Sequence, residues 1–160
     1  MTKRIEKAID IFLDAINNGT LAKGNCTACA VGNLVAHGLG GEITNNGCYF
    51  ECTVENSHWS SLFITYSDGQ LIRTRNLLNN NVQSNIKATD FTWEELALIE
   101  KTFETNTSID ADDYRNYTQK QIRADQIRGL EAVVKVMLQF DECKYDVKEV
   151  FTNKAVLICQ

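Results

Sequence analysis

The stretch Gly24–Asn33 reads GNCTACAVGN and holds the densest group of chemically unusual residues in the chain. Cys26 and Cys29 lie three residues apart, and the residues after them are small or apolar. From about Asn25 the apolar positions recur at helical spacing, and this pattern predicts a short helix. The stretch is therefore both a candidate packing motif and a candidate chemical site.

The predicted helix carries a strip of small residues on one side, formed by Ala28, Gly32 and Ala36. A strip without bulky side chains allows another helix backbone to approach closely. We expect that partner to be the long helix predicted over residues 118–140.

The other helices have clear start or stop signals. Apolar residues recur at helical spacing over residues 3–17, and Asn17-Asn18-Gly19 supplies a stop. Thr92 with Glu95, and Thr118 with Gln121, match the capping box and predict helices over 92–105 and 118–140. Gly129 inside the second of these costs about 1 kcal/mol relative to Ala. We therefore expect a close packing contact at Gly129.

Strand patterns are confined to the middle of the chain. Residues 62–66 and 70–73 are short β-prone runs on either side of Asp68-Gly69, a pair typical of hairpin turns. They predict either one small hairpin or an irregular segment lying on the core. The sequence as a whole predicts a mainly α fold, with residues 1–160 forming a single compact helical domain.

Composition limits the class of protein. The 160 residues suit one domain, and the formal net charge of −5 argues against a nucleic-acid binder, which usually has a basic face. The N-terminal residues alternate charged and apolar side chains, unlike a secretory signal. The uncharged stretch over residues 25–41 is too short and too polar to span a bilayer. We expect a cytoplasmic protein without a membrane segment.

Three blocks of the sequence resemble a known family. They are CTACAVGN at residues 26–33, FTWEEL at 91–96 and GLEAVV at 129–134. In order and content they resemble a family of small, uncharacterised bacterial and phage-type proteins with a C-x-x-C-A-V-G-N signature. The resemblance spans most of the chain but is dense only in these blocks.

Members of that family often carry the label of the Na⁺-translocating NADH-quinone reductase, as its flavin- and cluster-carrying component. That activity needs a ferredoxin-type cluster, whose plant-type site requires C-x4-C-x2-C, and a nucleotide-binding loop. Cys26 and Cys29 have no third cysteine close upstream, and no G-x-G-x-x-G occurs between a strand and a helix. The resemblance therefore implies a shared signature but not that activity.

Four cysteines form the candidate metal site. Cys26-x2-Cys29 and Cys48-x3-Cys52 have spacings near those of a four-thiolate zinc site. The second pair lacks the residues of a zinc knuckle, and the family signature includes only the first pair. Zinc at these four residues is an open alternative, and no other cofactor is predicted.

A thiol-redox role of Cys26 and Cys29 is the second alternative. A cysteine at a helix start has a lowered pKa, as in thioredoxin. The thioredoxin fold itself requires a preceding buried strand and a cis-proline, and the chain has no proline. A papain-like nucleophile is excluded because the only histidines, His37 and His58, both lie close to the motif and none follows far downstream.

Acidic residues give no complete site. Asp110, Asp112 and Asp113 match no register of a calcium loop and are expected in a solvated turn. Glu100 and Glu104, one helical turn apart, are expected on a solvated helix face. The leading interpretation is a non-catalytic module that binds an unidentified protein or small ligand, and no catalytic residue is assigned.

Overall fold

The computed structural model describes residues 1–25, 28–37, 43–44, 47–48, 65–67, 70–72 and 87–141. Helices dominate this part, as the sequence predicts. They are α1 (Lys3–Asn18), α2 (Ala30–His37), α5 (Trp93–Asn106), the 3-10 helix η2 (Ala111–Asn116) and α6 (Gln119–Phe140). Four short strands accompany them, namely β1 (Ile43–Thr44), β2 (Gly47–Cys48), β3 (Thr65–Ser67) and β4 (Gln70–Ile72). The predicted mainly α fold is confirmed.

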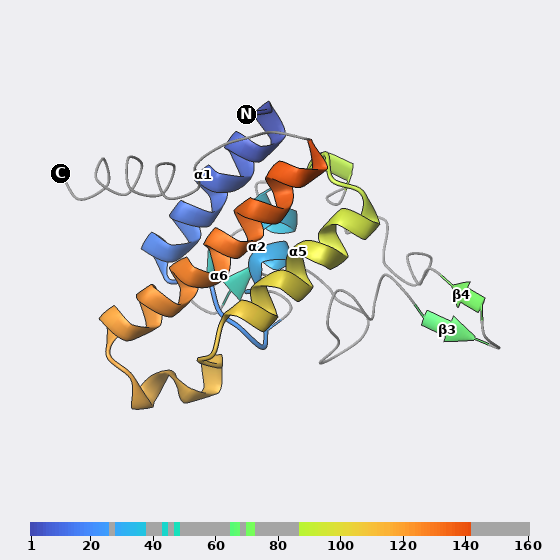
Figure 1. The fold of residues 1–160 in the computed structure, drawn as a ribbon. Helices are drawn as coiled ribbons and strands as arrows, with labels where there is room; N and C mark the ends of the chain where they lie inside the picture. The colour runs from blue at the N-terminus through green and yellow to red at the C-terminus, as the bar shows by residue number, and fades with distance from the viewer. Residues whose placement is uncertain are drawn as a thin grey trace.

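Three long helices lie side by side, with α6 between α1 and α5 (Figure 1). Helix α2 lies behind them and packs mainly against α1 and α5. The expectation that its small residues would face α6 is therefore wrong. Residues 30–35 are all buried, so α2 lies inside the core on every side and needs no single small-residue face.

The predicted helix ends agree well with the structure. Gly19 ends α1 in the left-handed conformation, with φ of 69°, and its N–H donates to the carbonyl of Ile16. Both capping boxes are formed, at Thr92 and at Thr118. Helix α2 begins later than predicted, at Ala30, because a turn closed by the Asn25 carbonyl precedes it.

The core combines the predicted apolar stripes of α1, α5 and α6. Its largest fully buried apolar side chains come from these helices and from the loop before α2, and they are Phe12, Phe103, Ile5, Ile9, Leu21, Leu96, Ile99, Leu130 and Met137. Gly129 lies where α6 crosses the end of α5. A Cβ atom there would be 2.5 Å from Thr107 Cγ2 and 3.0 Å from Phe103 Cδ2. The predicted close contact at Gly129 is confirmed.

The strands form two separate antiparallel pairs. β3 pairs with β4 so that Ser67 lies opposite Gln70, which confirms the predicted hairpin; its turn residues lie outside the described part. β1 pairs with β2, with Ile43 opposite Cys48, and the sequence did not predict this second pair.

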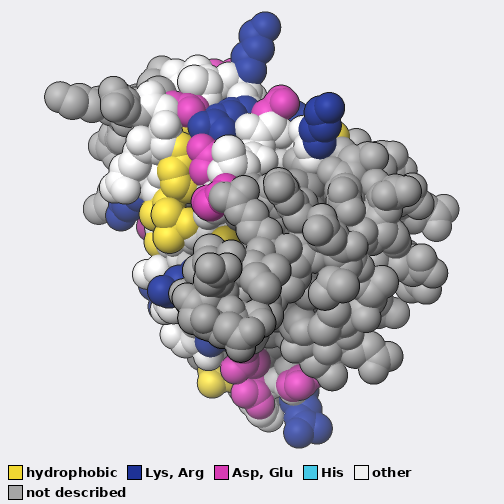
Figure 2. All heavy atoms as spheres, turned by 90° about the vertical axis from the view of Figure 1, so that its right-hand side faces the viewer, with side chains coloured by type: hydrophobic (Ala, Val, Ile, Leu, Met, Phe, Trp, Pro, Cys, Tyr) yellow, Lys and Arg dark blue, Asp and Glu magenta, His cyan; other side chains and the backbone are white. Residues whose placement is uncertain are grey.

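The described surface shows charges of both signs. On the face seen in Figure 2, Lys and Arg side chains lie next to Asp and Glu side chains on the described part of the chain. No described helix combines the length and the hydropathy that are needed to cross a bilayer.

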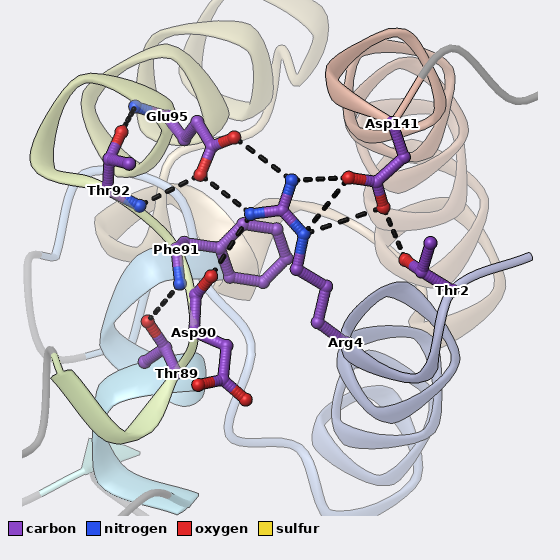
Figure 3. A network of polar contacts seen from close by, with 8 residues as sticks. All are labelled: Thr2, Arg4, Thr89, Asp90, Phe91, Thr92, Glu95 and Asp141. Atoms are coloured by element: carbon purple, nitrogen blue, oxygen red, sulfur yellow. Dashed lines mark hydrogen bonds and ion pairs between the residues drawn. The ribbon is translucent and has the colours of Figure 1, made fainter.

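One arginine links three helix ends (Figure 3). Arg4 in the first turn of α1 pairs with both carboxylate oxygens of Glu95 on α5, at 2.9 and 3.1 Å. It also donates to Asp141, the residue after α6, and its guanidinium lies 4.9 Å from the centroid of the Phe91 ring. Thr2 donates a further hydrogen bond to Asp141. These contacts hold the start of α1, the start of α5 and the end of α6 together.

The Asp141 carboxylate makes folding stability pH-dependent. Its hydrogen bonds from Arg4 and then Thr2 lower the pKa of Asp141. A lowered folded-state pKa stabilises the fold above the unfolded pKa, near 4, and this stability is lost as pH falls through the folded-state pKa. We expect Asp141→Asn to lower the free energy of unfolding by about 1 kcal/mol at pH 6 and by less at pH 3. Urea unfolding at pH 6, 4 and 3 measures this.

The matched control is Asp14→Asn, at an exposed α1 carboxylate that makes no hydrogen bond or ion pair with a described residue. It should reproduce the pH dependence of the unmodified protein. Equal losses from Asp141→Asn at all three pH values would contradict the role given to the Arg4 contact.

Candidate functional site

The structure places only part of the predicted cysteine site. Cys29 directly precedes α2 and is 1% exposed. Cys48 lies in β2, described by its backbone, while Cys26 and Cys52 lie outside the described residues. Within the described part of the chain, no three His, Cys, Asp or Glu residues gather as a metal site. The four-cysteine zinc site therefore stays a prediction.

Cys29 is surrounded by groups that favour its neutral thiol. Burial raises its pKa well above the usual value, and the negative charge of Glu100 adds to this effect. The N–H of Gly32 lies 3.4 Å from Sγ and acts in the opposite direction, but it is the smaller effect. A zinc ligand or a redox nucleophile must be a thiolate, which this environment disfavours.

Glu100 corrects one expectation from the sequence. It is 2% exposed, so the prediction that it lies on a solvated face is wrong. The reason is its position between Leu96 and Phe103, which share the core-facing side of α5. Glu104 is half-buried and accepts a hydrogen bond from the N–H of Gly24, at 3.1 Å. Asp110, Asp112 and Asp113 are exposed, as expected for a solvated turn.

Asn33, the last residue of the motif, organises the loop that contains the cysteines. It is completely buried, and its Nδ2 donates to the carbonyls of Thr20, Ala28 and Cys29 at 2.9 to 3.2 Å. Its Oδ1 accepts from the Thr20 hydroxyl at 2.9 Å. The amide thus joins the chain after α1 to the start of α2. The described contacts of Asn33 therefore hold two segments of the fold together, as expected for a packing motif.

A cleft opens where α1 ends beside the start of α6, at the opposite end of these two helices from the Arg4 contacts. We call it the α1–α6 cleft; its volume is about 580 Å³. Residues from three elements line it, among them Asn17, Asn18, Tyr114, Lys120, Arg123 and Gln126. The volume is in the range typical of small-molecule sites.

Gln126 is the most unusual residue of the α1–α6 cleft. It is 7% exposed, and its Nε2 donates to the Leu21 carbonyl at 2.5 Å and to the Tyr114 hydroxyl at 3.1 Å. Its Oε1 accepts no hydrogen bond from any described residue. Amide oxygens of buried residues are nearly always paired, so this atom has the capacity to accept from a donor that the described residues do not supply.

The neighbouring loops are held firmly by polar contacts. Asp125, buried on α6, accepts the N–H groups of Ser108 and Ile109 at 2.9 to 3.1 Å. Lys23 Nζ donates to the Thr107 carbonyl at 3.0 Å, and its own carbonyl accepts the N–H of Ala111 at 3.2 Å. The connector that carries Tyr114 is therefore fixed against the rest of the fold.

The α1–α6 cleft was not predicted from the sequence. One signal was present, because Gln126 lies four residues from both Ile122 and Leu130, inside the apolar stripe of α6. A polar residue at a core position needs a partner, and such positions indicate sites. The lining residues from α1 gave no signal, because their meeting with α6 is decided by tertiary packing.

No family model matches this chain, and neither does a curated protein or a solved structure. The class of molecule is therefore defined by the structure alone. In its described part it is a mainly α-helical protein with a buried cysteine, Cys29, at one place and the α1–α6 cleft at another.

Proposed function

We propose that this protein is a non-catalytic module that binds a small ligand in the α1–α6 cleft. The observation that carries the proposal is Gln126, a lining residue that is 7% exposed and whose Oε1 accepts no hydrogen bond from a described residue. A ligand with a hydroxyl or amino group would satisfy it. The fixed connector beside the cleft favours a preformed site, which loses little entropy on binding.

The test is a screen of small polar compounds by ligand-observed NMR, with a variant that fills the cleft. Asn18 is exposed at the cleft, and its side chain makes no hydrogen bond with a described residue. Asn18→Tyr should abolish binding of true cleft ligands. Asp14→Tyr, one turn earlier on α1 and outside the cleft lining, should leave binding unchanged. If Asn18→Tyr weakens the binding of none of the compounds that bind the unmodified protein, the proposal is wrong.

The rival function is a zinc or thiol-redox protein centred on Cys26 and Cys29. The buried, neutral thiol of Cys29 favours a packing role over this alternative. We expect Cys29 in the native protein to react with iodoacetamide at least ~100-fold more slowly than in urea, because reaction requires opening of the core. Site-resolved mass spectrometry of the alkylated peptide measures both rates.

Metal analysis of tag-free protein completes this comparison. Stoichiometric zinc, or a reversible Cys26–Cys29 disulfide formed under mild oxidation, would support the rival function. Protection of Cys29 without bound metal would support the binding module.

A further inference from the structure

We propose that the ligand of the α1–α6 cleft is a small organic anion, with a phosphate or carboxylate at one end and a hydrogen-bond donor at the other. This inference rests on the proposed function and specifies its ligand class. Its two parts follow from the two ends of the cleft.

The anion end lies at the start of α6. Lys120 and Arg123 both line the cleft, and no Asp or Glu is among its described lining residues, although the chain carries a net charge of −5. The backbone N–H groups of Gln119 and Lys120, in the first turn of α6, donate to no described residue. Exposed N–H groups and the positive end of a helix dipole favour an anion at this position.

Arg123 is already oriented for this role. Its Nη2 donates to Asn17 Oδ1 at 3.1 Å, which holds the guanidinium at the cleft and leaves its other N–H groups for a ligand. Lys120 Nζ makes no hydrogen bond or ion pair with a described residue. Neither cation is neutralised by a described carboxylate, so an incoming anion meets two uncompensated positive charges.

The donor end lies one to two turns further along α6, at Gln126. The Oε1 of Gln126 can only accept, so a ligand that meets it must donate there. The end of α1 adds acceptors, because the backbone carbonyls of Asn17 and Asn18 accept no hydrogen bond from any described residue. At 1.5 Å per residue, Gln126 is roughly 5 Å along the axis from Arg123 and roughly 10 Å from Gln119. The two ends of the ligand must therefore be a few bonds apart.

Matched small probes test both parts. The anions are phenyl phosphate, 4-aminophenyl phosphate, phenylacetate and 4-aminophenylacetate; aniline and benzylamine represent neutral and cationic compounds. We expect the anions to bind and each amino-substituted anion to bind about 5- to 10-fold more tightly than its partner. The phosphate and carboxylate pairs show which anionic group is preferred. Binding should weaken with added salt.

Two variants locate the anion. Lys120→Gln and Arg123→Gln should each weaken anion binding about 3- to 10-fold. Lys135→Gln, at an exposed lysine further along α6 and outside the cleft lining, is the control and should have no effect. Heteronuclear NMR titration reports the dissociation constant and the fold of each variant in one experiment.

The inference is overturned if aniline or benzylamine binds more tightly than the anions, if Lys120→Gln matches Lys135→Gln, or if the amino group brings no gain. It is also overturned if no anion binds at concentrations up to about 5 mM. If only neutral or cationic ligands bind, and Asn18→Tyr abolishes their binding, this inference is refuted and the proposed function stays intact. Absence of any Asn18-dependent ligand would refute both.

Discussion

Asn33→Asp is expected to destabilise the protein by about 3–5 kcal/mol at pH 7, although it changes almost no volume. The amide donates to three carbonyl groups inside the core, and a carboxylate in its place would bring negative charge toward the same oxygens. The Thr20 hydroxyl would donate to only one oxygen of the new carboxyl, so burial would raise its folded-state pKa above the unfolded value. The destabilisation should therefore grow as pH rises above about 4.

Urea unfolding of Asn33→Asp at pH 4 and pH 7 measures both the size and the sign. Asn116→Asp, at an exposed position on η2, is the control and should change stability by less than about 0.5 kcal/mol. A loss at pH 7 no larger than this control would show that the core does not depend on the Asn33 hydrogen bonds. In both experiments the loss of stability grows as pH rises, but for opposite reasons, because ionised Asp141 stabilises the fold whereas an ionised Asp at position 33 destabilises it.

Gly129→Val is expected to cost about 3 kcal/mol, and Gly129→Ala about 1–2 kcal/mol. Two effects compete in the alanine variant. Ala stabilises the α6 interior by about 1 kcal/mol relative to Gly, but its Cβ would lie 2.5 Å from Thr107 Cγ2. Thr107 is buried and its hydroxyl donates to the Phe103 carbonyl at 2.8 Å, so the methyl group cannot easily turn away. We therefore expect the steric effect to be larger.

A double variant tests this cause. Thr107→Ser removes the contacting methyl group and keeps the hydroxyl that bonds Phe103. In that background Gly129→Ala should cost at least about 1 kcal/mol less than it does alone. Chemical denaturation of the four proteins gives the coupling energy. If Gly129→Ala proves stabilising on its own, the close contact is relaxed at little cost and the helix-propensity term dominates.

Much of the fold could be predicted because its signals are local. The capping boxes at Thr92 and Thr118 and the stop at Gly19 each depend on residues within about one helical turn. The apolar stripe of α6 is visible from its spacing alone. For α2 the spacing was misleading, because a helix that is buried all round has no single face that periodicity can reveal.

The candidate site could not be predicted in the same way. Cysteines draw attention because of their chemistry, yet Cys29, whose side chain the structure describes, is buried as a neutral thiol. The polar residues with unusual environments are instead Asn33, Glu100 and Gln126, whose types suggest loops or surface. Their burial depends on partners far away in the sequence, so no local pattern distinguishes them from solvated residues.

By itself, the sequence determined the class of fold and the ends of α1, α5 and α6, because periodicity and capping act over a few neighbouring residues. Only the tertiary structure decided that α2 lies inside the core and that the end of α1 meets the start of α6 about a hundred residues later. That meeting creates the α1–α6 cleft and places the Gln126 acceptor and two cations around it. Sites of this kind depend on how helices pack, and packing is a property of the whole chain.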